Sequence, residues 1–160
     1  MDPEINPLFP TLSSTALDGG KVTLPDDCTG HVTLIFIAFR REAQSMIDSW
    51  ARPFDEAFEA DPRVLVYEVP MIGSLTGRLM GGFIDAGMRS GIPGARHPYV
   101  VTWYGRYERY CDILGMDDLS VAYIFLLDRD GRIRWRGKGY SDHTGLQDLL
   151  GMTRTLLSKE

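Results

Sequence analysis

Cys28 and Cys111 are the residues of this sequence best suited to chemistry, because a cysteine thiolate is a strong nucleophile and a redox group. They lie far apart in the chain, and neither belongs to a C-x-x-C pair. The sequence therefore predicts neither a dithiol redox centre nor a structural zinc site. A free cysteine usually packs as a small hydrophobic side chain, so two unreactive thiols are the simplest interpretation, and a disulfide between them stays open.

Other side chains that commonly carry chemistry lack the partners they would need. The histidines are scattered, at His31, His97 and His143, and none stands at ligand spacing from a cysteine or an acidic residue. No glycine-rich segment matches the phosphate-binding pattern G-x-x-x-x-G-K, and Ser45 lies outside the nucleophile pattern G-x-S-x-G. We therefore expect no catalytic residue, no metal ion and no cofactor.

A row of alternating cations is the candidate binding feature. Its members are Arg132, Arg134, Arg136 and Lys138. On a strand they would share one face, while Ile133, Trp135 and Gly137 would share the other. The cations either protect a sheet edge from aggregation or dock an anionic partner or lipid headgroups. We take the row, with Trp135, as the candidate partner site, and expect charge reversal at Arg134 and Arg136 to weaken binding at a nearly unchanged melting temperature.

Composition limits the class of protein. With 160 residues, 44% of them hydrophobic, the chain can form a single domain over residues 1–160, in which residues 1–11 are an extended lead. A net charge of −5 argues against general nucleic-acid binding, which needs a basic surface. Residues 1–12 resemble neither a signal peptide nor a mitochondrial presequence, and no apolar run approaches the roughly 20 residues that cross a bilayer. We expect a cytoplasmic protein.

Hydrophobic patterning predicts the elements that would position these residues. An apolar run over 124–127, a turn at 128–131 and the cation row read as a central strand and an antiparallel hairpin. The other expected elements are a hairpin over 12–24, a strand over 32–39, a helix from 43 interrupted near Pro53, a strand over 64–69 ended by Pro70, helices over 73–90 and 107–116 with a strand over 99–104 between them, and a last helix capped by Ser141 or Asp142.

The glycine-rich helix expected over 73–90 admits two interpretations. Its glycines each cost up to about 1 kcal/mol relative to alanine in a helix interior, so an independent helix would be soft. It is either a core helix with close backbone contacts or an adaptable helix that meets a partner or a membrane surface.

The order of elements predicts an α/β fold with a mixed central sheet flanked by helices. The segment FPTLSSTALDGGKVTLPDD followed by VTLIFIAF resembles the thioredoxin-like branch with an N-terminal β-hairpin, which includes peroxiredoxins and TlpA-like oxidoreductases. In those enzymes a nucleophilic cysteine opens the first long helix, where the helix dipole favours thiolate. Residues 39–45 contain no cysteine, and Ser120-Val121 stands where the resemblance implies a cis-proline. The sequence predicts a redox-inactive protein; the alternative is a thiol oxidoreductase or peroxidase that uses Cys28 or Cys111 as a displaced nucleophile.

A narrower resemblance rests on three segments: AYIFLLDRDGRIRWRGKG, YVVTWYGRYERYCDILGMDDL and FRREAQSMIDSWARPFDEAF. Over residues 31–150 the chain is similar to the mitochondrial ATP-synthase assembly-factor family called ATP-ten. This resemblance implies a chaperone for the membrane-embedded subunit of ATP synthase, without a catalytic centre or cofactor. The expected partner is a protein client, with a membrane protein as one candidate, and peripheral membrane contact stays open.

Overall fold

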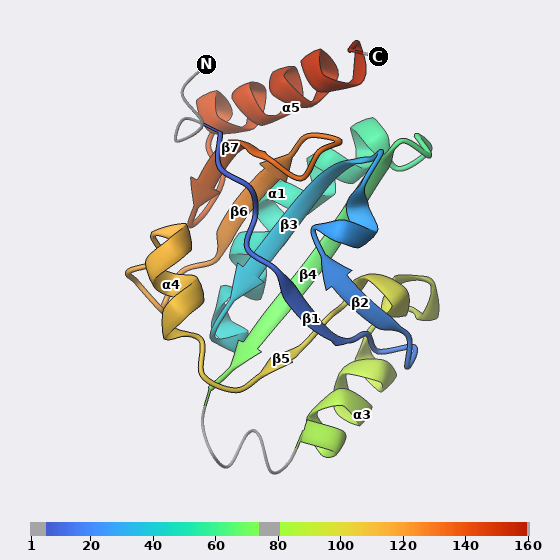
Figure 1. Cartoon of the computed structure of the whole chain (residues 1–160), viewed down its shortest axis with the longest axis vertical. Coiled ribbons are helices and arrows are strands. Elements are labelled where there is room, and N and C mark those ends of the chain that lie inside the picture. Colours follow the sequence, from blue (N-terminus) through green and yellow to red (C-terminus); the bar gives the residue numbers. More distant parts are fainter. Residues whose placement is uncertain (1–5, 74–80, 160) are drawn as a thin grey trace.

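A five-stranded mixed sheet organises the computed structural model, which describes residues 6–73 and 81–159 (Figure 1). Its strand order is β5-β4-β3-β6-β7. The central strand β3 (Val32–Ala38) runs parallel to β4 (Val64–Ile72) and antiparallel to β6 (Tyr123–Leu127). At the edges, β7 (Ile133–Lys138) pairs antiparallel with β6, and β5 (Trp103–Tyr104) pairs parallel with β4. The predicted mixed sheet, with its parallel crossover and its hairpin, is confirmed.

Two layers of hydrophobic residues cover the two faces of the sheet. Alternate side chains of β3 point to opposite sides, as strand geometry requires. Val32, Leu34 and Phe36 face α1 (Gln44–Phe58) and α5 (His143–Leu157). Ile35 and Ile37 face the hairpin of β1 (Leu12–Thr15) and β2 (Lys21–Leu24), together with α4 (Glu108–Leu114). Because both faces are covered, the central strands are apolar throughout, which is the signal that identified them.

Local signals at the helix ends behave as the sequence predicts. The Asp142 carboxylate accepts a hydrogen bond from the Gly145 amide at 2.7 Å and caps α5. Gly115 ends α4 with a φ of 68°, in the left-handed region that favours glycine.

Two prolines do not end their elements, contrary to the sequence-based prediction. Helix α1 continues through Pro53. The carbonyl that Pro53 leaves without its helical donor belongs to Ser49, and the Ser141 hydroxyl donates to it at 2.9 Å. Strand β4 continues through Pro70 to Ile72. The Pro70 nitrogen lies on the same side of β4 as the Glu68 carbonyl, and that side faces β5, which pairs with β4 at few positions. Because proline lacks an N–H group only on that side, the hydrogen bonds between β4 and β3 are unaffected.

The segment between β4 and α4 differs most from the expectation. The predicted strand over 99–104 is reduced to β5, and a 3₁₀ helix (Gly94–Tyr99) precedes it. The glycine-rich helix is α3 (Gly81–Gly91), and the part of the prediction that falls on residues 74–80 lies outside the described residues. In Figure 1, α3 stands at the end of the sheet next to β5.

Candidate functional site

The entrance to the first long helix holds aromatic and cationic side chains in place of a thiol. Strand β3 ends at Ala38, and a 3₁₀ turn (Arg41–Ala43) leads into α1. The Phe39 ring packs edge-on against Tyr107, with ring centroids 4.9 Å apart, and against Tyr123 at 6.4 Å. In the thioredoxin-like oxidoreductases that the sequence resembles, the nucleophilic cysteine stands at this position. In this chain the position holds a packed aromatic cluster instead.

Cys28 is buried at the far end of β3 from that entrance. It ends a 3₁₀ turn (Asp26–Cys28) just before β3, whose seven residues span about 20 Å. Its side chain is 1% exposed, and burial raises its pKa to about 11, against a smaller lowering effect from the Thr33 hydroxyl. At neutral pH this thiol is protonated.

Cys111 lies on α4, one helical turn after Tyr107, and is half-buried. Burial raises its pKa, and the negative charge of Asp112 raises it further. Both cysteines are free, so the open possibility of a disulfide between them is not realised. Neither has the electropositive surroundings that favour a reactive thiolate.

A bulge at Arg134 divides the predicted cation row. Leu126 pairs with Trp135 while Leu127 pairs with Ile133, so Arg134 is an extra residue on β7. The expectation that Ile133 and Trp135 share a face is therefore wrong. Ile133 packs with the hairpin layer, whereas Trp135 packs on the opposite face against Trp50, with centroids 5.3 Å apart.

The arginines of the row make contacts within the chain. Arg132 donates to the Asn6 carbonyl at 3.0 Å, and Arg134 forms an ion pair with Asp128 at 3.2 Å. Arg136 donates to the Leu114 carbonyl at 3.1 Å and lies 5.8 Å above the Phe125 ring. Charge reversal at Arg134 and Arg136 should therefore lower the melting temperature, which corrects the expectation drawn from the sequence. Arg136 and Lys138 remain exposed at the end of the row.

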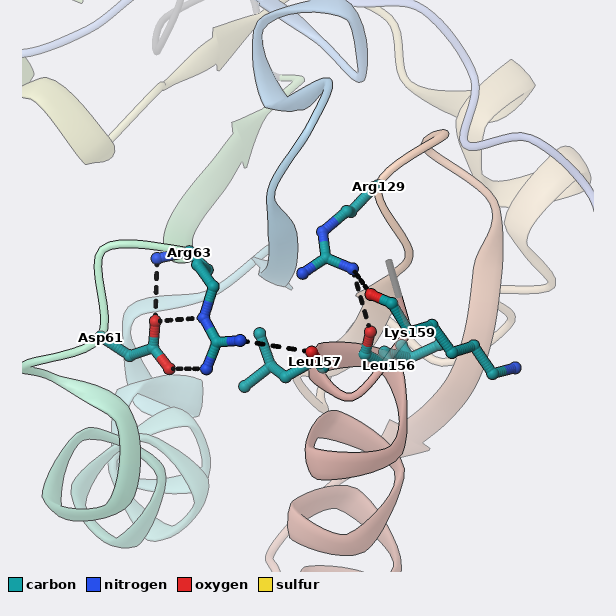
Figure 2. Close-up of polar contacts among 6 residues, drawn as sticks. All are labelled: Asp61, Arg63, Arg129, Leu156, Leu157 and Lys159. Atoms are coloured by element: carbon teal, nitrogen blue, oxygen red, sulfur yellow. Dashed lines mark hydrogen bonds and ion pairs between the residues drawn. The ribbon is translucent and has the colours of Figure 1, made fainter.

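Hydrogen bonds within the turn and to α5 account for the residues of the β6–β7 hairpin turn. Asp128 accepts hydrogen bonds from the amides of Asp130 and Arg132, both at 3.0 Å, and Gly131 adopts a φ of 80°. Arg129 donates to the carbonyls of Leu156 and Lys159 at the end of α5, as Figure 2 shows. The most distinctive motif of the sequence is thus a turn and a helix cap.

A cavity of about 850 Å³ opens between α1, the end of β4, α3 and the 3₁₀ helix that follows α3. Its apolar lining includes Ile47, Met71, Ile72, Ile84, Met88 and Ile92. Its polar lining consists of Arg40, Arg41, Gln44, Asp48, Glu68 and Arg96. A second cavity of about 240 Å³ continues along α1 and β4, and Arg96 lines both. We take these cavities together as the α1–β4 groove.

Glu68 is the least expected residue of the groove. Burial raises its pKa, Arg96 opposes the shift, and the charges of Asp48 and Asp55 add to it. Arg96 itself donates to the Val66 carbonyl at 3.2 Å. Sequence reasoning assigned Glu68 only to a strand; the signal that could have identified it is a carboxylate inside the apolar run VLVYEV.

Residues 6–73 and 81–159 contain neither a candidate metal site nor a candidate membrane-spanning helix. No cluster of histidine, cysteine, aspartate and glutamate side chains in this part of the chain could hold a metal ion. None of its helices is long and apolar enough to cross a membrane.

Three solved structures show the similarity in fold. A candidate protein disulfide isomerase from Bacteroides thetaiotaomicron superposes with a TM-score of 0.65 at 17% identity, covering 95% of this chain and 89% of that one. A candidate thiol:disulfide interchange protein DsbE from Chlorobium tepidum gives 0.61 at 15% identity, with 96% and 97% covered. BsSco, a member of the Sco family of cytochrome c oxidase assembly proteins, gives 0.61 at 12% identity, with 97% and 96% covered. These similarities confirm the thioredoxin-like fold.

The family assignment comes from sequence. No curated protein sequence matches this chain. The sequence profile of the family described as ATP10 protein matches residues 6–156, nearly the whole chain. This chain, a thioredoxin-like domain with no thiol at the entrance of α1, therefore belongs to the ATP10 family of ATP-synthase assembly factors.

Proposed function

We propose that this chain assists the assembly of ATP synthase by binding a protein client, and that it does so without thiol chemistry. The family supports the assembly role. The observation that carries the second part is the entrance to α1, where Arg40 and Arg41 stand in place of a nucleophile. Burial also raises the pKa of both thiols, so neither is prepared for attack on a disulfide. The client we propose is the membrane-embedded subunit of the synthase.

Genetic replacement tests both parts of this proposal. Cells that lack the protein should contain less assembled ATP synthase, measured on native gels. Expression of the wild-type chain should restore the assembled enzyme, and a variant with Cys28→Ala and Cys111→Ser should restore it equally, because no thiol takes part. Assembled enzyme at full level in the absence of the protein would refute the assembly role. Failure of a folded cysteine-free variant would refute the thiol-independent mechanism.

The alternative, an oxidoreductase with a displaced cysteine, has its own signature. Alkylation of each thiol is followed as a function of pH, and the reaction should rise only above the ordinary thiol pKa of about 8.5. A thiol that reacts at lower pH, together with a disulfide-reductase or peroxidase activity removed by Cys28→Ser or Cys111→Ser, would favour the enzyme.

The proposal includes the exposed end of the cation row, at Arg136 and Lys138, as a contact surface for the client. Within the described residues the side chain of Lys138 has no hydrogen bond or ion pair, so Lys138→Glu should leave the melting temperature nearly unchanged. Reduced recovery of the client, or of vesicles that contain anionic lipid, would support contact there. Unaltered recovery would leave the cations of β7 with the structural contacts described above.

A further inference from the structure

The α1–β4 groove has the dimensions and lining of a binding site. Its larger cavity, about 850 Å³, lies within the range of volumes found for ligand pockets. Two methionines, Met71 and Met88, contribute to its walls, and methionine adapts its shape to irregular apolar partners. An apolar segment of another protein could therefore be accommodated there without a rigid fit.

The wall of the groove that α3 forms has free space beside its glycines. Gly87 and Gly91 line the cavity, and a Cβ atom added at either position would meet no atom within 4 Å. The Tyr104 hydroxyl donates to Asp85 at 2.7 Å and ties the middle of α3 to β5. Figure 1 shows α3 beside the end of the sheet. This hydrogen bond links α3 to β5, and Gly87 and Gly91 leave room along the face of the helix that borders the groove.

The charged residues that line the groove bear on which kind of partner could bind there. Asp48 on α1 and Glu68 on β4 both line it and are half-buried, and neither belongs to an ion pair among the described residues. The Gln44 side-chain amide donates a hydrogen bond to Asp48 at 3.1 Å. Arg96 uses one guanidinium nitrogen on the Val66 carbonyl and lies 5.5 Å from the centroid of the Tyr99 ring.

The remaining cations of the groove, Arg40 and Arg41, line the same cavity as Asp48 and Glu68. Arg40 and Arg41 are exposed, so water screens them more than it screens Glu68. Burial raises the pKa of Glu68 above its ordinary value, although the charge of Arg96 and a hydrogen bond from Gln44 act in the opposite direction. A cation brought in by a partner would stabilise this carboxylate further.

We propose that the α1–β4 groove binds an apolar segment of the client that carries a basic residue, whose cation pairs with Glu68 and Asp48. The proposal rests on the client-binding function above and adds the chemistry of the bound segment. Apolar side chains of the segment contact Ile47, Met88 and Ile92, while its lysine or arginine reaches the two carboxylates between α1 and β4.

Charge recognition is tested with a fluorescently labelled helical peptide of leucine and alanine that has polar uncharged ends and one central lysine. A second peptide carries glutamine in place of that lysine. By fluorescence anisotropy the wild-type protein should bind the lysine peptide about tenfold more tightly, as expected for one charged hydrogen-bonded contact. Glu68→Gln should remove this preference and Asp48→Asn should reduce it. The control Glu56→Gln changes an exposed carboxylate of the same helix outside both cavities and should alter nothing.

Occupancy of the cavity is tested by filling it. Gly87→Trp places a bulky side chain where there is free space, so the fold should persist while both peptides bind more weakly. Gly151→Trp is the matched control, because it also lies on a helix, meets no atom within 4 Å, and does not line the groove. Circular dichroism confirms that each variant is folded.

The outcomes separate this inference from the proposed function. Absence of peptide binding, or binding that is unaffected by Glu68→Gln and by Gly87→Trp, would overturn the groove as the client site. The assembled level of ATP synthase in cells without the protein is measured independently and decides the assembly role. If the cells need the protein while the groove variants restore assembly fully, the function holds and the groove assignment fails.

Discussion

At the scale of single residues, Asp61 and Arg63 show how side chains hold the C-terminal helix in place. The Asp61 carboxylate accepts hydrogen bonds from the amide, Nε and Nη2 of Arg63 at 2.9, 3.0 and 2.8 Å. Nη1 of the same guanidinium donates to the Leu157 carbonyl at 3.2 Å, as Figure 2 shows. Asp61 thus orients an arginine whose charge complements the negative end of the α5 dipole.

The pH dependence of stability should report this arrangement. Hydrogen bonds from Arg63 lower the pKa of Asp61 from 3.8 to about 2. Because the folded-state pKa is the lower one, the stabilisation is complete above about pH 4 and is lost as the pH falls towards 2. The wild type should therefore be more stable than Asp61→Asn at pH 6, and this advantage should shrink between pH 4 and pH 2 in urea unfolding. An advantage that is constant with pH would show that the carboxylate charge plays no part.

At the scale of elements, the bulge in β7 determines which cations are available and where Trp135 packs. It moves Trp135 onto the α1 face, where Trp50 holds the ring, and the Trp50 indole is itself fixed by a hydrogen bond to the Gly139 carbonyl at 2.8 Å. A Cβ atom at Gly137 would lie 2.6 Å from Cη2 of Trp135. Glycine at this position is therefore required by packing, even though alanine has the better backbone propensity in most contexts.

Gly137→Ala should consequently destabilise the protein by about 1–3 kcal/mol, the usual cost of overpacking. Replacement of the indole by a smaller side chain in Trp135→Leu should remove most of that cost, so the double variant should be more stable than the sum of the single changes predicts. Chemical unfolding of the four proteins gives the coupling free energy. Gly151→Ala, where the added methyl group meets nothing, should stabilise slightly. Additive effects at 135 and 137 would contradict the packing explanation.

At the scale of the whole molecule, residues 6–9 close one end of the structure. The Ile133 amide donates to the Pro7 carbonyl at 2.8 Å, and the Phe9 amide donates to the Gly131 carbonyl at 2.9 Å, so this segment runs along the start of β7. Phe9 is 2% exposed and packs edge-on against Phe125 with centroids 5.9 Å apart. This part of the segment expected as an extended lead is integrated into the hairpin layer.

Phe9→Ala should lower the free energy of unfolding by about 3–5 kcal/mol, because it removes a fully buried aromatic ring. The neighbouring Leu8 is 53% exposed, so Leu8→Ala should change stability by no more than about 0.5 kcal/mol. Urea unfolding of both variants provides the comparison. Equal effects at the two positions would indicate that the segment is not anchored as described.

The sequence by itself determined the features that depend on neighbouring residues. Apolar runs identified β3 and β6, the glycine of the turn identified the β6–β7 hairpin, and Asp142 identified the start of α5. The absence of a cysteine at the α1 entrance could also be read directly, because the nucleophile's place is defined by its order along the chain.

Only the tertiary structure decided the features that depend on residues far apart in the chain. Helix α1 continues through Pro53 because the Ser141 hydroxyl donates to the carbonyl that the proline leaves without a partner. The three arginines of the cation row are engaged because the carbonyls of Asn6 and Leu114 and the Asp128 carboxylate lie beside them. The α1–β4 groove likewise exists only once Asp48, Glu68 and Arg96 come together. Hydrophobic periodicity records which side of an element is buried, but carries no information about which distant group it meets there.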